Sequence, residues 1–134
     1  MILTGEPVDA VLRTSEQDWL GSDPLGSFDD GLASVTESFS VPGILAAAVR
    51  HPKAGAMTAD QLRVLRVNEL TVHAWDLARA IDSDDRLDER VVSWLLEGLE
   101  PLRSNLGLCK AGPADDLPAA SPQGSLLRLL GRAG

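Results

Sequence analysis

Hydrophobic positions recur at helical spacing over most of the chain, and the clearest run follows Thr58. Thr58 and Gln61 stand three residues apart in "MTADQL", the spacing of a capping box, in which each side chain satisfies the other residue's backbone amide. We therefore expect a long helix from Thr58 to about Ile81. Its apolar residues occupy both sides of the helix, with Leu62, Leu65 and Val72 on one side and Val64, Val67 and Trp75 on the other. A helix that is apolar nearly all round is typical of the middle of a bundle, so this helix is predicted to be the central one.

A second amphipathic run precedes it. From Asp29 or Asp30 onward, Leu32, Val35 and Phe39 follow one another at helical spacing, and the pair Pro42-Gly43 marks the end of this predicted helix. Before it, a short helix is expected around residues 8–13. The following "ILAAAVR" fits either a short helix or an extended connector.

Two further helices are predicted towards the C-terminus. In "DERVVSWLLEGLEPLR", Asp88 is the expected N-cap, and Pro101 is expected to kink or end the helix. The residues that this helix is expected to turn toward a core are Val91, Trp94, Leu95 and Leu102. The last helix lies in "SPQGSLLRLLGR", with Ser121 as its cap, Pro122 at its first position and Gly131 as its end.

The chain shows no alternation typical of strands, so the fold class is predicted to be all-α. A length of 134 residues corresponds to about one domain with a single core. Cys109 is the single cysteine, which excludes an internal disulfide bond and favours a reducing, cytoplasmic location.

Charge excludes some classes of partner. The formal net charge is −8, and the sequence has no cluster of lysine and arginine, which argues against nucleic acid and against an anionic membrane surface. The longest uncharged run, "SFSVPGILAAAV", is too short to cross a bilayer. The N-terminal "MILTGEPVDAV" lacks the basic region of a signal peptide. We expect a cytoplasmic protein.

Candidate chemistry lies in "VNELTVHAWDLARA", where Glu69 and His73 stand four residues apart and are therefore neighbours on one edge of the long helix. Carboxylate oxygen and imidazole nitrogen both suit Zn²⁺, and a third ligand can come from a facing helix. Asp76 would then be a carboxylate behind the ligands or a helix-packing residue. One alternative is an ordinary pair on the helix surface with only a weak interaction, since this spacing occurs by chance in many helices. Because Glu69 and His73 are expected to lie in line with Leu62, Leu65 and Val72, the other alternative is a buried salt bridge between the two side chains.

The same stretch carries a resemblance. "NELTVHAWDLARAI", followed by a short acidic loop and "LDERVV", resembles the actinobacterial branch of the DinB-like, mycothiol-dependent maleylpyruvate isomerase-like family. Looser similarity extends over "LTGEPVDAV", "HPKAGAMTADQL" and "SPQGSLLRLLGR". The resemblance implies a four-helix bundle that holds a divalent metal, often zinc. It also implies that Glu69 and His73 are metal ligands and that the reaction is a mycothiol-dependent isomerisation or transfer.

The resemblance also implies that part of the bundle is missing. Members of the family begin with a helix-loop-helix that supplies another histidine ligand, so residues 1–134 are expected to form a single DinB-like domain, N-terminally truncated relative to the family: an incomplete four-helix bundle with a long central helix. His51, the other histidine, lies in the connector "RHPKAG", where the family has no ligand. The third metal ligand is therefore not identified.

Three explanations fit this shortfall: a longer complete protein, a remnant that kept the fold without catalysis, or two chains that pair over the apolar face left bare. The third explanation predicts a homodimer. The other expected partner is a small-molecule thiol or substrate. The alternative function is a non-catalytic helical dimer or partner-binding remnant, with Glu69 and His73 as a structural pair.

Overall fold

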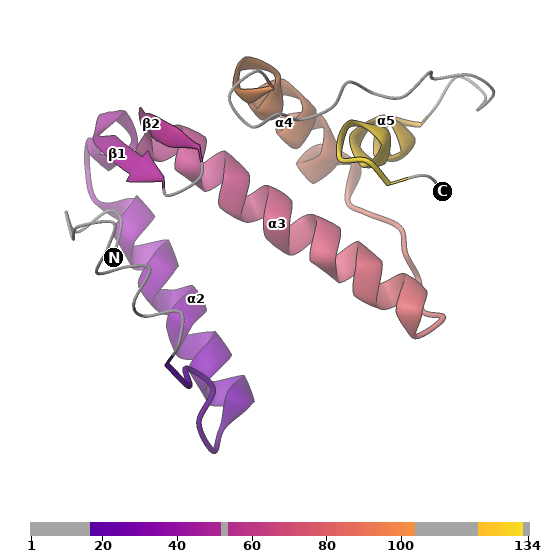
Figure 1. The fold of residues 1–134 in the computed structure, drawn as a ribbon, viewed down its shortest axis with the longest axis horizontal. Coiled ribbons are helices and arrows are strands. Elements are labelled where there is room, and N and C mark those ends of the chain that lie inside the picture. The colour runs from indigo at the N-terminus through magenta and orange to yellow at the C-terminus, as the bar shows by residue number, and fades with distance from the viewer. Residues whose placement is uncertain (1–16, 52–53, 104–120, 133–134) are drawn as a thin grey trace. The chain divides into compact units, whose positions relative to one another are not determined.

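The computed structural model describes residues 17–51, 54–103 and 121–132 of the chain. In chain order the elements are α2 (Pro24–Ser40), the 3-10 turn η3 (Ile44–Ala46), β1 (Ala48–His51), β2 (Gly55–Thr58), α3 (Ala59–Ala80), α4 (Glu89–Leu99), the 3-10 turn η4 (Glu100–Leu102) and α5 (Pro122–Leu129). The chain divides into two compact units, Met1–Arg63 and Val64–Gly134, and α3 begins in the first and continues in the second (Figure 1). The expected helix around residues 8–13 and Cys109 lie outside the described residues.

The chain is mostly helical, as the sequence predicts, but the all-α prediction is wrong in one respect, because the first unit contains a small antiparallel sheet. Strands β1 and β2 pair so that Val49 faces Met57, and both side chains are buried. Gly55 has a φ of 78°, a left-handed conformation that glycine adopts without steric cost. Each strand has four residues and one buried position, which is too little alternation to indicate a strand in the sequence.

Helix α2 begins earlier than the sequence suggested. Asp23 is its N-cap, with its side chain accepting a hydrogen bond from the Gly26 N–H at 3.0 Å, and Pro24 occupies the first helical position. The predicted start at Asp29 or Asp30 is therefore wrong by about a turn and a half.

The end of α2 is close to the prediction, since Ser40 is the last helical residue and Gly43 follows with a φ of 78°. No residue of α2 is buried, and four of its large apolar side chains are exposed: Leu25, Phe28, Leu32 and Val35. The stretch "ILAAAVR" contains both of the expected alternatives, the short turn η3 followed by the extended β1.

The capping box before α3 is confirmed. The Thr58 N–H donates to Gln61 Oε1 at 2.9 Å, and the Gln61 N–H donates to Thr58 Oγ1 at 3.2 Å. The helix then runs for 22 residues, about 33 Å at the usual rise, and ends at Ala80, next to the predicted end. The long helix of the prediction is therefore present.

The second unit builds its core from α4, η4 and α5, and its part of α3 adds further buried side chains. The fully buried side chains are Val92, Leu95, Leu99, Leu102 and Leu126. Of the predicted core residues, Leu95 and Leu102 are buried, whereas Val91 and Trp94 are only half-buried. Helix α3 approaches α4 closely, because a Cβ placed on Gly98 would lie 2.9 Å from a methyl group of Val64.

The ends of α4 and α5 follow the prediction. Asp88 accepts hydrogen bonds from the Arg90 and Val91 amides at 2.8 and 3.2 Å, and Ser121 accepts one from the Gly124 amide at 3.2 Å. Helix α4 stops at Leu99, and Pro101 falls within the turn η4 that follows it.

Candidate functional site

Glu69 and His73 lie on one edge of α3, as their spacing predicts, but on the exposed side of the helix. The side chain of Glu69 is 51% exposed and that of His73 is 73% exposed. Within the second unit the buried residues of α3 are Val64, Leu65, Val72 and Trp75. The expected burial of the two side chains is therefore wrong, and so is the alternative of a buried Glu69–His73 pair.

Each of the two side chains has its own partner on α3. Arg66 Nη1 lies 2.8 Å from Glu69 Oε2, and His73 Nδ1 lies 3.4 Å from Asp76 Oδ2. Exposed ion pairs of this kind contribute about 0–1 kcal/mol. A cation that bound Glu69 would therefore displace Arg66 at little cost in stability.

Asp76 contacts both His73 and Arg132, a residue near the C-terminus. Arg132 holds its carboxylate with two hydrogen bonds, from Nε to Oδ1 at 2.8 Å and from Nη2 to Oδ2 at 2.7 Å. These bonds, with a smaller contribution from His73, lower the pKa of Asp76 below its ordinary value, and the same pairing raises the pKa of Arg132. Asp76 is therefore ionised at neutral pH. It contacts His73 and links α3 to Arg132, three residues beyond the end of α5.

The contact with Asp76 affects which nitrogen of the His73 imidazole carries the hydrogen. A carboxylate next to Nδ1 favours the tautomer that carries its hydrogen there, which leaves the Nε2 lone pair free. Metal-binding histidines are commonly oriented in this way, with the second ring nitrogen donating to a carboxylate. Glu69 and His73 thus carry atoms of the two kinds that zinc binds, a carboxylate oxygen and an imidazole nitrogen.

The described part of the chain brings no complete set of metal ligands together. Among residues 17–51, 54–103 and 121–132, no three or more histidine, cysteine, aspartate and glutamate side chains come together as a metal site. His51 lies in the first unit, at the end of β1, where its Nδ1 accepts a hydrogen bond from the Ala54 amide at 3.0 Å. Glu69 and His73 are therefore two candidate ligands, and the described residues place no third beside them.

An apolar stripe runs beside the two candidate ligands. It consists of Leu70, Ala74 and Leu77 of α3 and of Ile81, which directly follows the helix; all four are exposed, and we call them the α3 stripe. Leu70, Leu77 and Ile81 are 52%, 60% and 65% exposed. Their spacing of seven and four residues places them on one face of the helix. The sequence does not predict this stripe. Apolar residues lie on nearly every side of α3, so the hydrophobic periodicity does not distinguish the buried face from the exposed one.

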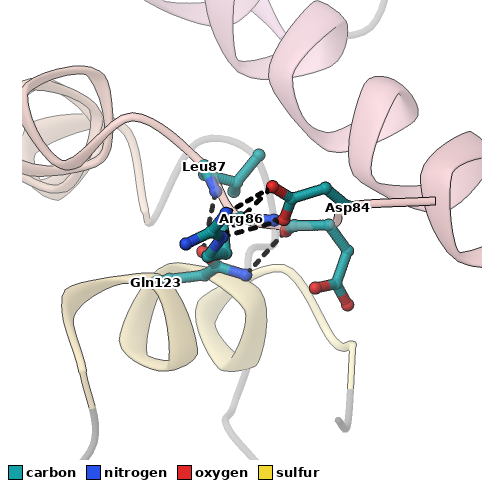
Figure 2. A network of polar contacts seen from close by, with 5 residues as sticks. Asp84, Arg86, Leu87 and Gln123 are labelled. Carbon is teal, nitrogen blue, oxygen red and sulfur yellow. Dashed lines mark hydrogen bonds and ion pairs between the residues drawn. The ribbon is translucent and has the colours of Figure 1, made fainter.

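The acidic loop between α3 and α4 is held by polar contacts, which Figure 2 shows. Arg86 donates to both carboxylate oxygens of Asp84, at 2.9 and 2.7 Å, and this pairing lowers the pKa of Asp84 to about 2. Gln123 of α5 accepts from the Leu87 N–H at 2.9 Å and donates to the Asp85 carbonyl at 3.0 Å. These two hydrogen bonds of Gln123 anchor the loop to α5. No local signal in the sequence points to Gln123, because its partners are 36 and 38 residues away.

Two buried polar atoms of α3, Asn68 Oδ1 and Trp75 Nε1, have no hydrogen-bond partner among the described residues. The ring of Trp75 has the guanidinium of Arg79 over it, 5.4 Å from the centroid. Asn68 and Trp75 are two helical turns apart, about 10 Å, so one water molecule does not serve both. They do not form part of the Glu69–His73 edge.

No protein-family model, curated protein or solved structure matches the chain. Within the described residues, no helix is both long enough and apolar enough to cross a membrane. The DinB-like resemblance remains a prediction from the sequence.

Proposed function

We propose that the chain is a helical protein that binds a divalent metal ion, with zinc the best fit, through Glu69 and His73 on the exposed edge of α3. The observation that supports this most is the contact between His73 Nδ1 and Asp76 Oδ2 at 3.4 Å, with Asp76 itself held by Arg132. It gives the imidazole a carboxylate on one nitrogen while the side chain stays 73% exposed for a ligand at the other.

The residues have distinct roles in this proposal. His73 and Glu69 bind the ion, Asp76 orients the imidazole, and Arg132 orients Asp76. A bound zinc ion supplies Lewis-acid chemistry, polarising a carbonyl or lowering the pKa of a thiol. On the family resemblance, the protein is a DinB-like bundle of the cytoplasm that acts in a mycothiol-dependent isomerisation or transfer.

A second candidate function is a non-catalytic helical protein that binds a partner through its apolar surface. The α3 stripe favours it, since exposed apolar patches mark interaction sites. In that function the pairs Arg66–Glu69 and His73–Asp76 are ordinary helix-surface contacts, and no metal is needed.

Zinc binding by variants separates the two functions. We expect Glu69→Ala and His73→Ala each to lower zinc affinity at least tenfold in equilibrium dialysis, because each removes one of the two proposed ligands. Asp76→Asn should lower the affinity by about 10- to 100-fold, the usual effect of removing the carboxylate behind a histidine ligand.

The matched control is Glu97→Ala, which removes an exposed carboxylate from α4, outside the site. Because Glu69, His73 and Glu97 are all exposed, each variant should keep its helical circular dichroism. Unchanged zinc affinity in both Glu69→Ala and His73→Ala would refute the metal site and favour the partner-binding function.

A further inference from the structure

Arg66 contacts one of the two proposed metal ligands. Its Nη1 lies 2.8 Å from Glu69 Oε2, and the two side chains are 48% and 51% exposed. A guanidinium cation and a zinc ion are attracted to the same carboxylate oxygens. Before any metal ion binds, Glu69 therefore already has a cation beside it, supplied by its own helix.

The position of Arg66 along α3 places this cation on the side of Glu69 that faces away from His73. Arg66 precedes Glu69 by three residues and His73 follows it by four, so the two neighbours lie about one helical turn to either side. In the described part of the chain, Glu69 pairs with Arg66 and forms no ion pair with His73. An ion that binds both proposed ligands lies between them, so its binding turns the carboxylate from Arg66 toward His73.

The partner of His73 has a different effect on metal binding. Asp76 contacts Nδ1 of the imidazole at 3.4 Å and leaves Nε2 for a metal ion. Arg66, in contrast, contacts the carboxylate that the metal ion needs. Its positive charge also repels a dication that approaches Glu69.

We propose that Arg66 is an internal competitor of the metal ion, and that its pair with Glu69 lowers the zinc affinity of this edge of α3. This inference rests on the proposed function, because it requires that Glu69 and His73 bind zinc. It adds an autoinhibitory contact, which opens when zinc binds both ligands.

The zinc affinity of the full chain carrying Arg66→Gln tests the proposal, measured by competition with a fluorescent zinc chelator. Glutamine is a good helix former, and it has no charge to hold the Glu69 carboxylate. Exposed ion pairs are weak because water and salt screen them. We therefore expect the variant to bind zinc about two- to fivefold more tightly than the unaltered chain.

The matched control is Arg79→Gln, which removes the same charge from another exposed arginine of α3. Arg66 lies seven residues before His73 and Arg79 six residues after it, so both are about 10 Å from it along the helix. The ion-pair partner of Arg79 is Asp85, at 3.4 Å, and not Glu69. In about 0.15 M salt a charge at this distance is largely screened, so the control should change zinc affinity less than about twofold.

The outcomes separate the inference from the proposed function. An unchanged affinity in Arg66→Gln overturns the competition, and an equal rise in both arginine variants overturns it by showing that only the charge of the helix matters. A lower affinity overturns it as well, since Arg66 would then hold Glu69 in position for the metal ion. In these three cases the metal site stands if Glu69→Ala and His73→Ala weaken zinc binding. Absence of zinc binding by the unaltered chain refutes the proposed function and the inference together.

Discussion

Gly98 marks the closest approach between α3 and α4, and replacing it with alanine tests their packing. A Cβ at this position would lie 2.9 and 3.0 Å from the two γ-methyl groups of Val64, well inside the 3.5–4.0 Å that carbon atoms prefer. Val64 is buried, and a valine in a helix has one strongly preferred rotamer, so it cannot turn away. The helices must therefore separate by a fraction of an ångström.

The expected magnitude follows from two opposing terms. Overpacking of this kind costs about 1–3 kcal/mol. Alanine in place of glycine inside a helix contributes about 1 kcal/mol in the opposite direction. Gly98→Ala should therefore lower the free energy of unfolding of the second unit by up to about 2 kcal/mol.

Hydrogen exchange of the α3 and α4 amides is the assay, because it reports on the second unit by itself. In the double variant Gly98→Ala/Val64→Ala the added methyl group occupies space that the valine vacates, so the combined loss should be smaller than the sum of the two single losses by about 1 kcal/mol. The control is Gly31→Ala on α2, where a Cβ would meet no atom within 4 Å. Gly31→Ala is therefore expected to stabilise its helix. An equal stabilisation by Gly98→Ala would refute the close approach of α3 and α4.

Three other predictions concern the ends and links of the second unit. Asp88→Ala removes the cap of α4 and should cost about 1 kcal/mol in urea denaturation; an unchanged midpoint would contradict the cap. Gln123→Ala leaves the Leu87 N–H without its acceptor and should cost about 1–3 kcal/mol in the same assay, whereas a loss below a few tenths would mean that water replaces the side chain. Asp76→Asn removes a carboxylate whose pKa Arg132 holds below the ordinary 3.8, so its stabilising effect is present above that pH and is lost as the pH falls through the lowered pKa. The stability deficit of Asp76→Asn should accordingly be present at pH 7 and shrink below about pH 4 in thermal denaturation, and a deficit that is constant down to pH 2 would contradict the linkage.

Helix ends could be predicted where a side chain caps its own neighbours. The Thr58–Gln61 box, the Asp88 cap and the Ser121–Pro122 start all depend on residues two or three positions apart, so the sequence contains the whole interaction. The start of α2 carries the same signal in Asp23–Pro24. It was missed because the surrounding "GSDPLGS" is also typical of a turn.

Features that depend on distant residues could not be predicted in the same way. The hairpin of β1 and β2 becomes visible only when Val49 is paired with Met57. The exposure of Glu69 and His73 depends on which face of α3 is covered, and a helix with apolar residues on nearly every side gives no signal of that choice. The contact of Asp76 with Arg132 joins residues 56 positions apart, beyond any local pattern.

The most direct test of the metal site is an NMR titration of the imidazole nitrogens with zinc. The chain has two histidines, so His51 serves as an internal control for His73. We predict that zinc shifts the Nε2 resonance of His73 as expected for coordination and leaves His51 unchanged, and that Glu69→Ala weakens the shift. Zinc that moved neither resonance, or only that of His51, would contradict the proposal that the exposed edge of α3 binds a metal ion.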